Sequence, residues 1–209
     1  NPIMLLSEND RVGYISSMFI FAMLSLWLLN KRHKIFYFIF GCILLFNAYF
    51  LLKMVHYWNI SNNIAYSFGK NFNYYDRKEI IILGIPDNYK GIWALRADNS
   101  ALKEFIEFKL HKKVNATIYE VANYNQTAYE NGVNVKQEND STLYVTFKQY
   151  GNWWWKGGLG MSSYENEKYK VTTDEWCGYH LLIKNKHQHN YTFIYPDNLQ
   201  WKEFIFEKH

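Results

Sequence analysis

The residues with the most distinctive chemistry are three consecutive tryptophans, Trp153, Trp154 and Trp155, which precede a lysine and a glycine-rich stretch. Indole rings stack on the C–H faces of sugars, and glycines let a ligand approach the backbone closely. On a strand, Trp153 and Trp155 would share one face and Trp154 would take the other. Two interpretations stay open: a glycan-stacking platform, or packing against the core or lipid headgroups.

Other candidate groups are weaker. His187 and His189 could place two imidazoles on one side of a strand, as metal ligands require, but no third ligand is close in sequence, so a solvated loop is favoured. The acidic pair Asp174–Glu175 has no neighbours that would raise a pKa for acid–base work. The sequence shows neither a phosphate-binding glycine loop nor a serine nucleophile elbow. We therefore predict no catalytic residue, metal or cofactor in this chain.

Two apolar runs are the elements that must position these residues. Val12–Leu29 and Ile35–Leu52 each contain 18 residues without Asp, Glu, Lys or Arg. That length suits a helix crossing a hydrocarbon layer of about 30 Å, with some tilt. Neither run has a polar helical face, which argues against the alternative of a buried core hairpin in a soluble protein. The sequence predicts two transmembrane helices within residues 1–58, joined by the basic loop 30–34.

The basic loop predicts the orientation of this hairpin. Lys31, Arg32 and Lys34 lie in a short connection between the runs, where the positive-inside rule predicts the cytoplasm. Both chain termini should then be extracytoplasmic. Tyr57 and Trp58, after the second run, are typical of an interfacial aromatic anchor. The sequence thus predicts an integral membrane protein with membrane lipids as partners.

Residues 59–209 are predicted to form a separate extracytoplasmic domain. They carry 18 basic and 17 acidic residues, and this near-neutral balance excludes the basic footprint of a nucleic-acid-binding protein. Cys42 lies within the second apolar run and Cys177 lies far from it in the polar domain. Because one cysteine would be at membrane depth, we expect no disulfide between them.

The polar domain is predicted to be a small α+β domain rich in strands. Glu79–Ile85 predicts a buried strand around the apolar run Ile80–Leu83, and Gly84–Asn88 predicts the turn that follows this run. Ala101–Leu110 has the apolar spacing of a helix. Asn123–Asp140 is polar and asparagine-rich and predicts a loop. Further predicted strands are Ala116–Ala122, Ser141–Gln149, Tyr169–Thr173, Tyr179–Lys184 and Asn190–Tyr195.

Two segments resemble a known family. Glu8–Ser17 (ENDRVGYISS) resembles the Asp/Glu-Arg-Tyr-x-Tyr-x-x-Ser signature before a late transmembrane helix in GT-C class membrane glycosyltransferases, with Val12 in place of the usual tyrosine. These enzymes use polyprenyl-phosphate sugars, as relatives of protein O-mannosyltransferases do. Ile81–Gly91 (IILGIPDNYKG) looks like the Leu-Pro-Asp-Asn-Tyr-x-Gly segment in the extracytoplasmic tail of Bacteroidetes-type members. The β-rich remainder matches no family in this way.

The resemblance implies a site for the donor phosphate. It would place Arg11 near the lipid-linked phosphate, with Asp10 and Tyr14 in support. An arginine at the headgroup level can donate two parallel hydrogen bonds to a phosphate. The alternative is that Asp10 and Arg11 cap a helix start and reach to the interface. Since the family's acidic catalytic residues lie in an early outer loop, they would be upstream of Asn1, and we expect the chain to be part of a longer protein.

Two functions are therefore expected. The first is the C-terminal portion of a polyprenyl-phosphate-sugar-dependent glycosyltransferase of the bacterial inner membrane. The hairpin would complete its transmembrane bundle, and the outer domain would contact acceptor or glycan. Its partners would be the remainder of the polytopic protein and a polyprenyl-phosphate sugar. The second is a non-catalytic membrane-anchored subunit or scaffold of a larger membrane assembly.

Overall fold

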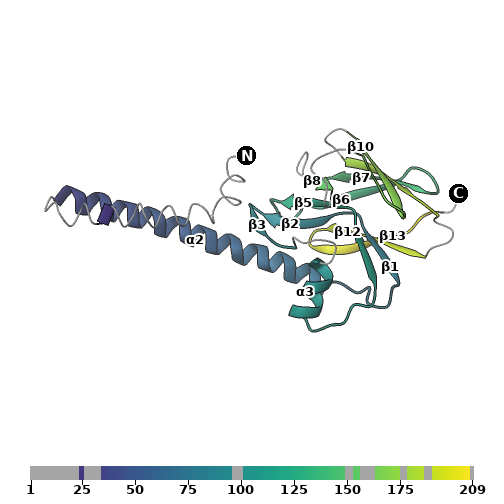
Figure 1. Cartoon of the computed structure of the whole chain (residues 1–209), viewed down its shortest axis with the longest axis horizontal. Coiled ribbons are helices and arrows are strands. Elements are labelled where there is room, and N and C mark those ends of the chain that lie inside the picture. The colour runs from purple at the N-terminus through teal and green to yellow at the C-terminus, as the bar shows by residue number, and fades with distance from the viewer. Residues whose placement is uncertain are drawn as a thin grey trace. The chain divides into compact units, whose positions relative to one another are not determined.

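A computed structural model of the chain describes residues 24–25, 34–95, 101–148, 153–155, 163–174, 178–185 and 190–207 (Figure 1). A long helix, α2, is followed by a domain built mostly from strands, with one short helix, α3. The helices are α2 (Lys34–Lys70) and α3 (Ala101–Lys109), and the strands are β1 (Glu79–Ile82), β2 (Ile85–Tyr89), β3 (Ile92–Trp93), β4 (Thr117–Glu120), β5 (Ala122–Gln126), β6 (Val133–Gln137), β7 (Thr142–Phe147), β8 (Trp153–Trp155), β9 (Tyr164–Glu165), β10 (Tyr169–Asp174), β11 (Gly178–Ile183), β12 (Tyr191–Asp197) and β13 (Gln200–Phe204).

The predicted fold class, a two-helix membrane hairpin with a small α+β domain, is wrong. Among the described residues, one helix is long and apolar enough to cross a membrane, within Tyr37–Lys70, and the domain after it consists of three β-sheets with the short helix α3. Helix α2 includes the predicted span Ile35–Leu52 and continues beyond it to Lys70. No proline interrupts residues 52–70, and apolar residues keep their helical spacing there. The first predicted span, Val12–Leu29, lies outside the described residues except for Leu24 and Ser25.

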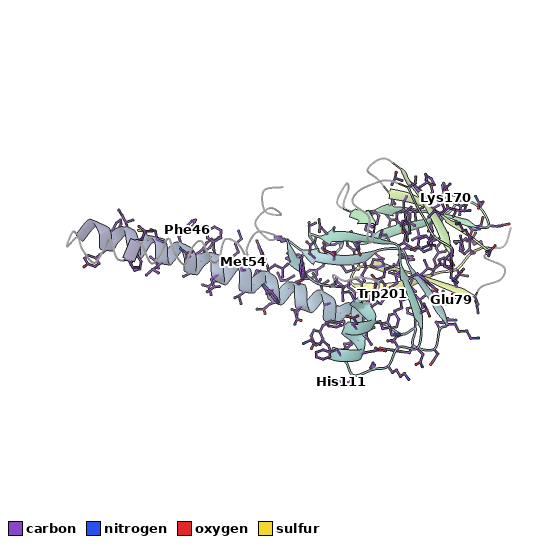
Figure 2. The ribbon with its side chains drawn as sticks, viewed as in Figure 1. Phe46, Met54, Glu79, His111, Lys170 and Trp201 are labelled. Carbon is purple, nitrogen blue, oxygen red and sulfur yellow. The ribbon has the colours of Figure 1, made fainter. Side chains whose placement is uncertain are left out.

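The chain divides into two compact units whose boundary falls within α2. Asn1–Ile60 and Lys90–Ile92 form the first, and Ser61–Tyr89 and Trp93–His209 form the second. In the first unit, α2 exposes large apolar side chains such as Phe46, which Figure 2 labels. This exposed apolar surface is typical of a helix that lies in lipid.

In the second unit, the last turns of α2 have one buried face. Ser61, Ile64, Ala65 and Phe68 are buried, and their spacing places them on one side of the helix. Phe68 packs against Trp201 of β13, which Figure 2 labels, with ring centroids 4.8 Å apart. The Trp201 Nε1–H donates to the Phe68 carbonyl at 2.9 Å. The same helix is therefore apolar all round in its first part and amphipathic in its last turns.

The strands form three sheets, ordered β13-β12-β1-β4, β6-β7-β11-β10-β9 and β3-β2-β5-β8. The central strand β1 is parallel to both β12 and β4. Its residues Ile80–Ile82 are fully buried, as is Leu83, and burial on both faces explains the continuous apolar run. The predicted strand there is confirmed, and so is the predicted helix at Ala101–Leu110, which α3 matches.

Two predictions within this domain are wrong. The predicted turn Gly84–Asn88 is mostly strand β2, because its residues pair with β5 and are buried. The predicted loop Asn123–Asp140 contains most of β5 and all of β6. In both places the polar residues that suggested a loop lie in a sheet, where pairing with a distant strand overrides the local preference.

Candidate functional site

Buried polar side chains gather on the neighbouring strands β2 and β5. Burying an amide or a carboxylate is costly unless hydrogen bonds replace those to water, so such residues are normally exposed. Their concentration on two paired strands marks this place in the described structure as the strongest candidate site. The residues are Asp87 and Asn88 on β2, at 5% and 6% exposure, and Asn123, Asn125 and Gln126 on β5, at 8%, 4% and 0%.

Asn88 is the centre of this cluster. Its Nδ2 group donates to Asp87 Oδ2 at 2.9 Å and also to the side-chain oxygen of Asn125. One amide thus links the carboxylate of its own strand to the amide of the next strand. Hydrogen bonds to an ionised acceptor are stronger than those between neutral groups, and a buried network of this kind holds its members in one arrangement.

A β-bulge positions Asp87. The parallel register pairs Pro86 with Tyr124 and Asn88 with Asn125, and it shifts between Pro86 and Asn88, so Asp87 is the extra residue. Bulges redirect side chains and are frequent beside functional sites. Pro86 has no N–H for the ladder, and a bulge is one of the few places where a strand accepts a proline. The local sequence Pro-Asp-Asn therefore suits this geometry.

Backbone hydrogen bonds join this segment to the residues after β3. Ala94 N–H donates to the Asp87 carbonyl at 2.8 Å, and Leu95 N–H donates to the Pro86 carbonyl at 3.2 Å. The Ser61 hydroxyl donates to the Trp93 carbonyl at 2.8 Å. Trp93 itself is 57% exposed. The buried polar cluster is thus connected through the backbone to an exposed indole that the sequence analysis did not single out.

Two buried oxygen atoms of β5 have no hydrogen-bond partner among the described residues: the Tyr124 hydroxyl and Gln126 Oε1. Burial raises the pKa of the Tyr124 phenol far above its ordinary value, and the carboxylate of Asp197 raises it further. The Gln126 Nε2 group donates to the Ala128 carbonyl at 3.1 Å. Buried polar atoms without partners are rare, and each one costs stability.

Asp197 is held by two lysines. The ammonium groups of Lys148 and Lys202 each bond one of its carboxylate oxygens. The hydrogen bond from Lys148, followed by that from Lys202, lowers the pKa of Asp197 below its usual value. Lys148 follows β7 and Lys202 lies on β13, so this carboxylate joins two different sheets. We assign it a structural role.

The predicted tryptophan platform lies beside the polar strand. Trp153–Trp155 forms β8, which is antiparallel to β5 and stands at the edge of its sheet. In register, Asn123 is opposite Trp154, and Tyr124 is opposite Trp153. The structure therefore places the backbone of the predicted platform next to the strand that carries three buried amide residues.

The other predicted site residues fall outside the part of the chain that the structure describes. Asp10, Arg11 and Tyr14 lie outside the described residues, and so do His187 and His189. Within the described residues, no group of three or more His, Cys, Asp or Glu side chains could hold a metal ion. Sequence reasoning missed Asp87 and Asn88 as buried residues because Pro, Asp and Asn are typical of turns. The apolar run directly before them was the available signal.

Comparison with known proteins finds no protein-family model, curated protein or solved structure that matches this chain. The chain is therefore described by the features of its own structure. It combines a long helix, apolar and exposed over most of its length, with a three-sheet domain that buries a polar strand pair.

Proposed function

We propose that this chain is the membrane-anchored, glycan-contacting portion of a polyprenyl-phosphate-sugar-dependent glycosyltransferase of the bacterial inner membrane. One observation carries the proposal. The segment that resembles the outer tail of such enzymes, Ile81–Gly91, contains the bulge where Asp87 and Asn88 are buried and hydrogen-bonded. Few sequences can form a bulged strand with a buried carboxylate and a buried amide, whereas many can form a surface turn. The resemblance over this segment is therefore more specific than a resemblance over a surface turn would be.

Membrane anchoring is supported by the exposure of α2. Phe38, Leu45 and Leu52 are 72%, 73% and 70% exposed. Water would not stabilise so much contiguous apolar surface, whereas a lipid hydrocarbon layer would. The apolar part of α2 ends near Tyr57 and Trp58, residue types that favour the membrane interface.

Glycan contact is supported by the residues around the polar strand pair. Exposed indoles offer flat apolar faces for sugar rings, and Trp93 is held by the Ser61 hydrogen bond to its backbone. The buried network of Asn88 would act by positioning β2 and the residues after it. In the reaction, an acceptor oxygen would form a bond to the anomeric carbon while the bond from that carbon to the lipid phosphate breaks with inversion. The acid or base for this step would lie outside this chain.

The test uses the natural full-length protein in membrane vesicles. Transfer of labelled sugar from a polyprenyl-phosphate donor is measured for the wild type, Trp93→Ala and the matched control Tyr129→Ala, which alters an aromatic residue of 49% exposure elsewhere. We expect donor-dependent transfer in the wild type and the control, with a higher KM for acceptor in Trp93→Ala. Absence of any donor-dependent transfer by the folded wild type would overturn the proposal.

A second candidate function, a non-catalytic subunit or scaffold, is favoured by the surface of α3. Phe108 is 75% exposed and, with Leu95 and Phe105, lines an open hollow of about 290 Å³. Such an apolar surface suits a protein partner. Photo-crosslinking from position 108 in native membranes would trap a partner subunit if this function holds. Donor-dependent transfer without any crosslinked partner would contradict it.

A further inference from the structure

Two lysines approach one tyrosine ring in the first unit. The Lys90 ammonium lies 5.0 Å from the centroid of the Tyr57 ring, and that of Lys53 lies 5.9 Å from it. The ring of His56 lies 5.9 Å from the same ring. Cations are attracted to an aromatic face at such distances. Two ammonium groups beside one phenol ring concentrate positive charge at this place, and such a concentration attracts an anion.

The backbone places Lys90 there at a conformational cost. Lys90 and Gly91 connect β2 to β3, and both have positive φ, 50° and 86°. Glycine adopts positive φ freely, whereas placing a lysine in this region costs conformational free energy. The turn conformation by itself would therefore favour glycine over lysine at position 90. Two-residue turns with positive φ at both positions are the tight turns of β-hairpins. This tight turn therefore fixes the backbone position of Lys90, which carries one of the two ammonium groups.

The position along α2 indicates which anion fits. Phe50, Leu51 and Leu52 are exposed apolar residues, and Lys53 follows them directly. Trp58 is 63% exposed and is of the type found at the membrane interface. A basic group at the end of an apolar helical stretch lies at the depth of the lipid phosphates when that stretch is in the membrane.

We infer that Lys53, Tyr57 and Lys90 form a binding site for the phosphate of an anionic phospholipid headgroup. The two ammonium groups donate to the phosphate oxygens, and the Tyr57 ring holds both lysines toward it. The inference rests on the membrane insertion of α2 in the proposed function. It does not depend on sugar transfer.

The test compares lipid retention by the full chain. The protein is purified in mild detergent and mixed with equal amounts of phosphatidylglycerol and phosphatidylcholine, and bound lipids are counted by native mass spectrometry. We expect preferential retention of phosphatidylglycerol. Each of Lys53→Gln and Lys90→Gln should reduce that preference by about fivefold, and the double variant by more, since a lysine near an anionic surface contributes ~1 kcal/mol.

Controls separate charge in general from this site. The variant Lys70→Gln/Lys78→Gln removes two exposed lysines elsewhere and should leave the lipid preference unchanged. Tyr57→Phe keeps an aromatic face and should retain the preference, whereas Tyr57→Leu should weaken it. An equal loss in the Lys70/Lys78 variant would overturn the inference, because it would show unspecific attraction.

Two further arms distinguish other outcomes. Excess inorganic phosphate should not displace phosphatidylglycerol; complete displacement would show a free-phosphate site and overturn the lipid assignment. Binding to neutral phosphatidylcholine vesicles that survives an alkaline wash tests insertion of α2 by itself. Failure of this binding would overturn the proposed anchoring together with the lipid site. Insertion without a phosphatidylglycerol preference would overturn the lipid site only.

Discussion

Removal of the Tyr124 hydroxyl should stabilise the protein. Tyr124 is fully buried, its ring lies 5.9 Å from that of Phe147, and its hydroxyl has no hydrogen-bond partner among the described residues. A buried hydroxyl without a partner costs ~1–3 kcal/mol, because its bonds to water are lost on folding and not replaced. Tyr124→Phe keeps the ring and its packing. We expect the free energy of unfolding to rise by ~1 kcal/mol.

Tyr179→Phe is the matched control. Tyr179 is fully buried in the same core cluster, but its hydroxyl donates to the Leu83 carbonyl. Loss of that bond should lower the free energy of unfolding by ~1–2 kcal/mol, because a buried acceptor loses a donor. The same chemical change is therefore expected to have opposite signs at two positions of one core.

Urea unfolding of the full chain in detergent, followed by tryptophan fluorescence, measures both variants. In thermal unfolding, a change of 1 kcal/mol in a domain of this size corresponds to ~2–4 °C in Tm. The reasoning is refuted if Tyr124→Phe is destabilised as much as Tyr179→Phe, since the Tyr124 hydroxyl would then have a partner.

Three further predictions concern pH and packing. Burial raises the pKa of the Tyr124, Tyr169 and Tyr179 phenols in the folded protein. These phenols should leave the stability unchanged below about pH 10 and lower it above that pH, where the unfolded phenols ionise, by ~1.4 kcal/mol per pH unit for each phenol. Circular dichroism in alkaline buffers measures this loss. The lowered pKa of Asp197 contributes stability that is present above about pH 4 and is lost as the pH falls through the folded-state pKa. Asp197→Asn should lower the free energy of unfolding by ~1–2 kcal/mol and remove this acid dependence, as measured by urea titrations at several pH values. Gly178→Ala would place a Cβ atom on the Val145 carbonyl oxygen and should cost more than ~3 kcal/mol, whereas Gly41→Ala, with no atom within 4 Å, should express and melt like the wild type.

Local sequence determined the elements whose hydrogen bonds are local. The apolar run Ile35–Leu52 forms helix because helical bonds join residues four apart, and α3 follows from the spacing of its apolar residues. The strand Ile80–Leu83 was visible because a central parallel strand is apolar on both faces. The positions of these elements along the chain follow from their own residues, although the partners of the strand do not.

Tertiary structure alone decided the candidate site. Pro86–Asn88 favours a turn by residue type, and it becomes a bulged strand only because β5 supplies a ladder from residues far along the chain. Asn125 is likewise polar by type and buried because Asn88 donates to it. Sequence could name the tryptophans of β8, but only strand pairing placed them beside β5. The reason is physical: a helix satisfies its backbone by itself, whereas a strand takes its partner, its burial and its neighbours from the rest of the fold.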